Sequence, residues 1–290
     1  MNKKKINNKT IALLNEYELQ AKKSYGQNFL IDQNTINNII TKANVHKKLN
    51  VIEIGPGLGS LTIELAKKAN KVVCIEIDTK LKAALENNLQ DYDNVTVIYD
   101  DFLKIDLEKL IKDNFNKDEE IIVVANLPYY ITTPILIKIF ESKRNLKITR
   151  ICAMMQKEVG LRLSANKDTK DYNSLTILTQ YYCDAKLVLS VSKNVFIPKP
   201  NVDSVVVLFT FKEQLVKPIN ELLFFKLLRI LFAQRRKTIL NNLKQLIKDK
   251  DTIEKILNLA NLDPKLRAEN LSLEDIILLS DIINKEGYDD

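Results

Sequence analysis

The sequence predicts an α/β domain with a mostly parallel sheet, followed by a small all-α domain. From residue 50 onward, strand-like apolar segments alternate with segments of helical periodicity. A glycine-rich turn joins the first of these strands to its helix, and beyond Phe211 only helical periods remain. A chain of 290 residues, 46% of them hydrophobic, can bury a core for both domains.

The region before the first strand is expected to cover the sheet. Residues 1–10 are rich in Lys and Asn and expected to be disordered at first, and a helix is expected at 11–22. A polar and aromatic loop at 24–32 leads into a helix at 34–43. Because a disordered arm would not need Phe29 and Leu30, we interpret this loop as a lid over a ligand of the first strand. A plain connection between helices is the alternative.

The sheet is expected to contain strands at 51–54, 71–77, 95–99, 121–125, 149–155, 185–191 and 204–211, with helices at 58–68 and 79–89. Alternation at this spacing implies parallel neighbours, since these need a crossover helix. The last strands could form an antiparallel hairpin at one edge.

The C-terminal part is expected to be helical, at 222–232, 238–248, 252–259 and 273–283, after a linker marked by Lys217 and Pro218. We therefore predict an N-terminal extension at 1–23, a sheet domain at 24–212 and a helical domain at 213–290.

The composition argues against several classes of protein. The longest uncharged segment, 121–137, is interrupted by Asn126, Pro128 and Pro134, so neither a membrane span nor a signal peptide is expected, and we predict a cytoplasmic protein. One histidine, His46, gives little from which to build a metal site, and none is expected. Three scattered cysteines in or beside apolar runs indicate buried free thiols.

The glycine-rich turn contains Gly55, Gly57 and Gly59, directly after Glu53 and Ile54. Glycines allow the backbone to approach a ligand closely, and the following helix presents free N–H groups. The spacing G-x-G-x-G differs from the dinucleotide fingerprint, and an acidic side chain at Glu53 is unfavourable beside a pyrophosphate. It suits a cationic amino group, which favours S-adenosylmethionine.

Two further acidic positions follow the next strands. Glu76 can accept hydrogen bonds from both hydroxyls of a ribose, as nicotinamide enzymes also do. One of Asp100 and Asp101 can accept the adenine amine, with Phe102 or Leu103 beside the ring. The alternative for the Asp pair is a turn or a helix cap. All these positions follow strand ends, where an open parallel sheet binds its ligands.

The segment Asn126, Leu127, Pro128 and Tyr129 ends the apolar run 121–125. The Asn126 side-chain oxygen and a backbone carbonyl at Leu127 or Pro128 could bind the amine hydrogens of an adenine, and Tyr129 could stack on its ring. Such stacking is worth ~1–3 kcal/mol per base. The alternative is a proline turn with a core tyrosine.

Two further regions suggest a nucleic acid. The loop 194–204 offers Phe196 to cover the other face of a base and Lys199 to approach phosphate, although prolines before an edge strand are often structural. Between Lys226 and Lys250 there are eight basic residues and one acid, which indicates a polyanion partner or, alternatively, a solvated helix face.

With these stretches placed, the chain resembles the KsgA-type ribosomal RNA adenine dimethyltransferases. The matching stretches are SYGQNFLID, VIEIGPGLGSLT, CIEID, DDFL, VANLPYYITTPI, MMQKEVGLRL, NVFIPKPNVDSVVV and LFAQRRKTILNNL. The resemblance implies a Rossmann-like class I methyltransferase domain with a small helical domain after it.

The resemblance also implies the chemistry: methylation of two neighbouring adenosines in a hairpin near the 3′ end of small-subunit ribosomal RNA, in a 30S particle or its precursor. It places the S-adenosylmethionine site at Asn28, Leu30, Gly55, Glu76, Asp101 and Asn126, and the glycine turn and the adenine-flanking position add Gly57 and Phe102. The catalytic segment remains the one expected from its chemistry, Asn126 to Tyr129 with Phe196. Asp101 is preferred because it directly precedes Phe102; the family often has glycine where Asp100 stands. RNA contacts are expected at Lys199, Arg229, Arg235, Arg236 and Lys237, and the protein is expected to be a monomer.

Three alternatives stay open. The related large-subunit enzymes linked to macrolide resistance share the methyltransferase half, although LFAQRRKTILNNL favours the small-subunit branch. An assembly factor that acts mainly by binding is a second alternative, and a nicotinamide dehydrogenase is a distant third.

Overall fold

The computed structural model describes residues 8–19, 26–116, 119–142, 146–213 and 216–288. The expectations for residues 1–7 and 20–25, which include Ser24 and Tyr25 of the lid, lie outside these residues. The helix expected at 11–22 was predicted too long: it ends at Glu16, and Glu18 has a φ of 49°, which no helix continues through. The chain divides into two compact units. The first comprises Met1–Gly160 and Lys186–Phe211, and the second comprises Leu161–Ala185 and Lys212–Asp290. The segment 161–185 therefore belongs with the C-terminal helices, although it precedes residue 212.

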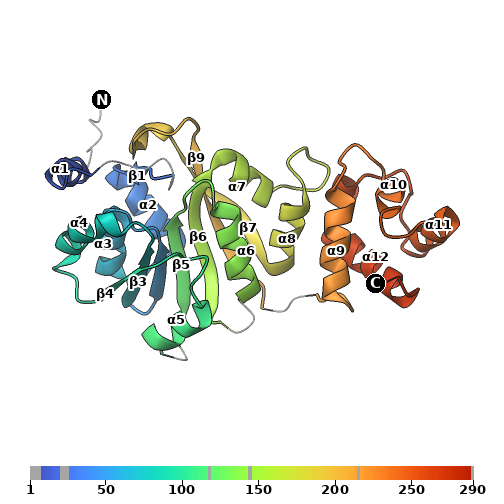
Figure 1. The fold of residues 1–290 in the computed structure, drawn as a ribbon, viewed down its shortest axis with the longest axis horizontal. Helices are drawn as coiled ribbons and strands as arrows, with labels where there is room; N and C mark the ends of the chain where they lie inside the picture. The colour runs from blue at the N-terminus through green and yellow to red at the C-terminus, as the bar shows by residue number, and fades with distance from the viewer. Residues whose placement is uncertain (1–7, 20–25, 117–118, 143–145, 214–215, 289–290) are drawn as a thin grey trace. The chain divides into compact units, whose positions relative to one another are not determined.

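The first unit is built on a seven-stranded sheet of order β4-β3-β2-β5-β6-β9-β7 (Figure 1). The strands are β2 Asn50–Ile54, β3 Lys71–Glu76, β4 Val95–Tyr99, β5 Ile121–Asn126, β6 Ile148–Gln156, β7 Cys183–Val191 and β9 Ser204–Phe211. Strands β2 to β6 pair in parallel, and β9 pairs antiparallel with β6. The predicted fold class is confirmed. The strand order changes direction between β2 and β5, so ligands are expected at the carboxyl ends of these strands.

Helices cover both faces of the sheet. On one face α2 Gln33–Ala43 and α3 Ser60–Lys68 pack on Val51, Val72 and other buried strand residues. On the other face α6 Thr132–Ser142 places Phe140 against Phe209 and Phe211 at ring-centroid distances of 5.9 Å. Phe209 and Phe211 thus share one face of β9, while Val206 and Leu208 pack in the core on the other face, as the strand period requires. The remaining elements of this part are α1 Asn8–Glu16, η2 Thr79–Leu81, α4 Lys82–Leu89, α5 Leu107–Asn114 and α7 Lys157–Leu163.

A small second sheet joins two segments that are far apart in the sequence. Strand β1, Phe29–Leu30, pairs antiparallel with β8, Phe196–Ile197, so that Phe29 faces Ile197 and Leu30 faces Phe196. The N–H of Ile31 extends the pairing by donating to the carbonyl of Val195, in η4 Lys193–Val195, at 2.9 Å. The expected lid is therefore fastened to the loop that precedes β9.

The second unit is helical, with α8 Ser174–Tyr182, α9 Glu221–Phe232, α10 Ile239–Leu243, α11 Lys250–Leu259, η5 Ala268–Asn270 and α12 Leu273–Lys285. The helix expected at 238–248 is shorter than predicted, because after Leu243 the chain makes a tighter turn in which the N–H of Leu246 donates to the carbonyl of Leu243 at 2.9 Å. Asp249 then starts a new helix by accepting the N–H of Thr252 at 2.9 Å. Within the described ranges, no helix is long and apolar enough to cross a membrane.

Candidate active site

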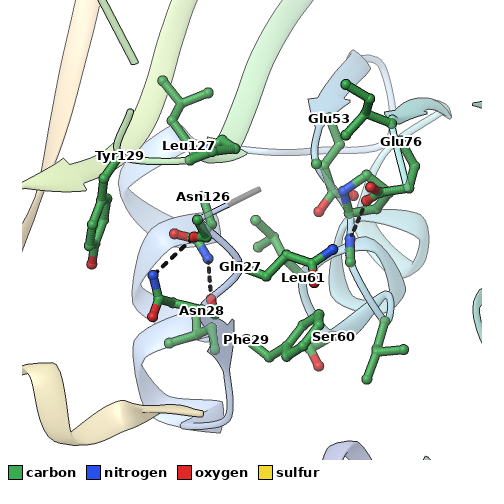
Figure 2. Close-up of a pocket in the computed structure, with 18 residues that line it drawn as sticks. Gln27, Asn28, Phe29, Glu53, Ser60, Leu61, Glu76, Asn126, Leu127 and Tyr129 are labelled. Carbon is green, nitrogen blue, oxygen red and sulfur yellow. Dashed lines mark hydrogen bonds between the residues drawn. The ribbon is translucent and has the colours of Figure 1, made fainter. Parts of the chain in front are cut away.

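One cavity lies at the carboxyl ends of β2, β3 and β5. Nine predicted site residues line it: Asn28, Leu30, Gly55, Gly57, Glu76, Asn126, Leu127, Pro128 and Tyr129. Figure 2 shows Asn126 and Tyr129 on one side of the cavity and Glu53 and Glu76 on the other. The positions converge because parallel strands end at the same edge of a sheet.

The glycine turn and Glu76 form one wall. Gly57 has a φ of 59°, and an added Cβ would lie 3.1 Å from the ring of Phe29, so the lid packs directly on the turn. The Glu76 carboxylate, 4% exposed, accepts the N–H of Gly57 at 3.0 Å through Oε2 and that of Asp78 at 2.8 Å through Oε1. Burial raises the pKa of Glu76, and these backbone hydrogen bonds oppose the rise. Each oxygen keeps a second lone pair for a hydroxyl donor.

Glu53 is the second acid of this wall. Its side chain is 1% exposed, and the Cys74 thiol donates to its Oε2 at 3.5 Å. Burial raises its pKa from 4.5 to about 7, and the neighbouring charge of Glu76 acts in the same direction. A cation brought into the cavity would favour the charged carboxylate and oppose the effect of burial.

Asn126 is oriented by the expected lid. Its Nδ2 donates to the carbonyl of Asn28 at 3.1 Å, and the Asn28 Nδ2 donates to the carbonyl of Gly26 at 3.0 Å (Figure 2). Because Nδ2 is engaged, the Asn126 oxygen remains as an acceptor at the cavity.

The two candidate backbone acceptors, the carbonyls of Leu127 and Pro128, differ in the hydrogen bonds that they already accept. The carbonyl of Pro128 accepts the N–H of Ile131 at 3.2 Å and the hydroxyl of Thr132 at 3.0 Å, as the chain turns into α6. Its two lone pairs are therefore used. The carbonyl of Leu127 accepts no hydrogen bond from the residues that the structure describes, while the Leu127 N–H donates to Met154 at 3.0 Å. The Leu127 carbonyl is thus the available one.

Tyr129 is held at its far end. Its hydroxyl and that of Ser204, which is 1% exposed, are 2.7 Å apart. Burial raises the pKa of Tyr129, so the phenol stays neutral near pH 7. The hydrogen bond anchors the far end of the ring at the cavity wall, where one face of a planar ligand could stack.

Comparison with known proteins identifies the chain. The model of the family described as ribosomal RNA adenine dimethylase matches residues 18–285. The chain belongs to this family. It is accordingly an S-adenosylmethionine-dependent methyltransferase, as the sequence predicts.

Curated relatives of this dimethylase chain match nearly its whole length. Proteins named ribosomal RNA small subunit methyltransferase A are 47% identical in Bacillus cytotoxicus, over 95% of this chain and 96% of the relative, and 48% identical in Bacillus pumilus, over 96% of each. Among solved structures, a dimethyladenosine transferase from Plasmodium falciparum has a TM-score of 0.73 and 28% identity, covering 89% of this chain and 98% of that one. The 23S rRNA methyltransferase ErmE has a TM-score of 0.67 and 26% identity, covering 89% and 100%.

Three predicted ligand contacts of this dimethylase lie outside the cavity. Asp101 is held in a turn, where its Oδ1 accepts the N–H of Leu103 at 3.0 Å, and Phe102 is 5% exposed. Phe196 is 3% exposed and packs in the core beside Leu30, so its ring is covered here. The roles of Asp101, Phe102 and Phe196 stay predictions.

All the basic residues that were singled out for RNA are exposed: Lys199, Arg229, Arg235, Arg236 and Lys237. Arg235 in addition donates to the carbonyl of Lys170 at 2.6 Å and lies 3.4 Å from Glu269. Arg235 therefore has a structural partner within the second unit.

Some cavity residues were not predicted as ligand contacts. Gln27 donates to Oδ2 of Asp78, 3% exposed, at 3.0 Å, and Ser60 and Leu61 line the wall at the start of α3. The aromatic and polar lid segment was the available signal for Gln27, but no local pattern indicates Asp78 as its partner. Among the described residues, no cluster of three or more His, Cys, Asp or Glu could hold a metal ion.

Proposed function

We propose that the protein transfers methyl groups from S-adenosylmethionine to N6 of two adjacent adenosines in the 3′-terminal hairpin loop of small-subunit (16S) ribosomal RNA, giving N6,N6-dimethyladenosine. The observation that supports small-subunit RNA as the substrate is the set of relatives named for the small subunit, at 47% and 48% identity over nearly the whole chain. The large-subunit enzyme ErmE has the same fold at 26% identity.

The cavity fits the cofactor by the chemistry of its donors and acceptors. In this proposal Glu76 accepts the ribose hydroxyls, Glu53 offers negative charge to the amino group, and the glycine turn lies against the amino-acid part. Asn28 and Leu30 cover the cofactor, and Asp101 with Phe102 holds its adenine. The cofactor supplies a methyl group on a positively charged sulfur. The buried Glu53, with a pKa of about 7, supports this assignment because a cationic partner would stabilise its charged form.

The target adenine is proposed to bind at Asn126. The N6 lone pair is delocalised into the ring, so the amine is a weak nucleophile. The Asn126 oxygen and the Leu127 carbonyl accept its two hydrogens and favour a pyramidal nitrogen. Pro128 fixes the backbone, and Tyr129 stacks on the base, with Phe196 proposed for its other face. Positioning of this kind can lower a barrier by roughly 7–11 kcal/mol in favourable cases. No general base is needed within this scheme.

The RNA surface is proposed to include Lys199 together with Arg229, Arg235, Arg236 and Lys237. We further propose that residues 24–212 act as the methyltransferase domain and residues 213–290 as the RNA-binding domain. The substrate would be a 30S particle or its precursor, met in the cytoplasm by a monomeric enzyme.

The direct test is a methylation assay with labelled S-adenosylmethionine on naked RNA, 30S and 50S particles from cells that lack the modification. Dimethyladenosine in digests of 30S RNA is expected, and label confined to 50S RNA would overturn the choice of subunit. If the main role were binding, cells carrying Glu76→Ala would still mature their subunits normally, whereas cells that depend on methylation would not.

A further inference from the structure

Lys138, on α6, has a complete set of hydrogen-bond acceptors in the loop that follows β4. Its ammonium group donates to the carbonyl of Phe102 at 2.8 Å, to that of Leu103 at 2.9 Å and to that of Ile105. A lysine ammonium has three donors, so all of them are directed at one loop. The same Nζ lies 5.5 Å from the centroid of the Phe102 ring.

This arrangement is more than a surface contact. Burial lowers the pKa of Lys138, and the carboxylates of Asp101, Asp106 and Asp100 oppose that shift, so the ammonium is held by negative groups of the same loop. Without Lys138, three carbonyls that point to one place would lose a shared charged partner. Hydrogen bonds to charged groups are the stronger ones, so these part-buried contacts hold the loop against α6.

The loop is shaped from two sides. From within, Asp101 accepts the N–H of Leu103 through Oδ1 at 3.0 Å and that of Lys104 through its carbonyl at 2.8 Å. From outside, Lys138 draws the carbonyls of the next residues toward α6. The direction of the Asp101 carboxylate therefore depends on where Lys138 holds the loop. The same helix begins at Thr132, three residues after Tyr129.

We propose that Lys138 is a positioning residue for the adenine subsite of the cofactor, acting through the 102–105 carbonyls to aim Asp101 at the adenine amine. The inference rests on the proposed function, in which Asp101 accepts that amine. It assigns Lys138 no contact with either substrate.

The test compares two probes that differ at that amine. S-adenosylhomocysteine carries it, and S-inosylhomocysteine has a carbonyl oxygen in its place. Titration calorimetry gives the affinity of each for the parent protein and for Lys138→Met, which keeps the length of the side chain without its charge. The parent should prefer S-adenosylhomocysteine by about 10- to 100-fold, the size of a hydrogen bond to a charged group. Lys138→Met should bring the ratio close to one, and Lys138→Arg should restore part of it.

The ratio separates positioning from general stability. Both probes are measured on the same preparation, so an unfolded fraction lowers the active concentration for both and leaves the ratio unchanged. Lys82→Met is the matched control: Lys82 also lies over an aromatic ring, 5.3 Å from the centroid of Tyr99, and should leave the ratio at the parent value.

Replacing Asp101 distinguishes the two possible failures. Asparagine keeps an acceptor oxygen, so Asp101→Ala, which removes it, completes the test. If Asp101→Ala abolishes the preference and Lys138→Met keeps it, the inference about Lys138 is wrong and the adenine subsite stands. If Asp101→Ala keeps the preference, the proposed adenine subsite itself is wrong. Loss of the preference in both Asp101→Ala and Lys138→Met, with Lys82→Met unchanged, supports the positioning role.

Discussion

Replacing Glu53 with glutamine should make the stability of the free protein less sensitive to pH. Glu53 is 1% exposed, and burial raises its pKa from 4.5 to about 7. The folded protein thus holds this proton more tightly than the unfolded chain does. The contribution of the protonated group to stability is complete below about pH 4.5 and is lost as the pH rises through about 7.

The size of the effect follows from the shift. A difference of about 2.5 pKa units corresponds to about 3 kcal/mol. Glutamine does not ionise, so the stability of Glu53→Gln relative to the parent should rise by up to that amount between pH 4.5 and pH 7.5, and stay level above. Glu76, which also titrates, is present in both proteins and largely cancels in the difference.

The assay is urea denaturation of both proteins without cofactor at a series of pH values, with the free energy of unfolding compared at each. Parallel curves for the two proteins would refute the reasoning. The effect of Glu53→Gln on ligand affinity should be opposite to its effect on stability. S-adenosylhomocysteine carries a cationic amino group, so Glu53→Gln should weaken its binding at pH 8 and have little effect at pH 5.5. A loss of the same size at both pH values would show that charge is not the role of Glu53.

Three other predictions address the remaining walls of the site and the RNA surface. Asn126→Ala should abolish methyl transfer while RNA retention in a filter-binding assay is largely kept; an equal loss of both would contradict its role. Arg236→Gln should reduce the slope of log affinity against log salt by about 0.7–0.9, the value for one phosphate contact, and an unchanged slope would place the RNA surface elsewhere. Gly57→Ala should destabilise the protein by roughly 1–2 kcal/mol from its positive φ and by more from the ring of Phe29. Gly287→Ala is the control for the cost of a positive φ alone, because Gly287 has a φ of 78° and no neighbour within 4 Å of the added Cβ. Stability is measured by chemical denaturation. Equal losses of stability in the two variants would mean that the Phe29 contact is unimportant.

The sheet could be predicted because most of its strands are short, largely apolar runs such as β5, whereas β7 carries Asp184 and Lys186 and is partly exposed. The residues of the cavity wall could be predicted from the sheet, because Glu53, Glu76 and Asn126 lie at or near the carboxyl ends of strands that are neighbours in the structure. These conclusions need only the local pattern and the rule that parallel strands end at a common edge.

Other features depended on information that the local sequence does not contain. The helix α6 was not predicted, because Pro134 interrupts the pattern; it is tolerated in the first turn, where its missing N–H would have no helical partner. The pairing of β1 with β8 joins two-residue segments too short to give a periodic signal. The contacts of Lys138 with carbonyls in residues 102–105 could not be predicted either, because the sequence of a helix does not show which distant acceptors its lysine side chains contact.

The pairing of β1 with β8 has a mechanical consequence for an enzyme that must use one cofactor molecule for each methyl group. Phe29 and Leu30 belong to the segment that lines the cavity, and their partners, Ile197 and Phe196, belong to the loop proposed to face the base. A displacement of β1 that opens the cavity must either carry β8 with it or break the hydrogen bonds between them. If Phe196 faces the target base as proposed, exchange of spent cofactor would be coupled to the binding of the target nucleotide, and the two could not be adjusted independently.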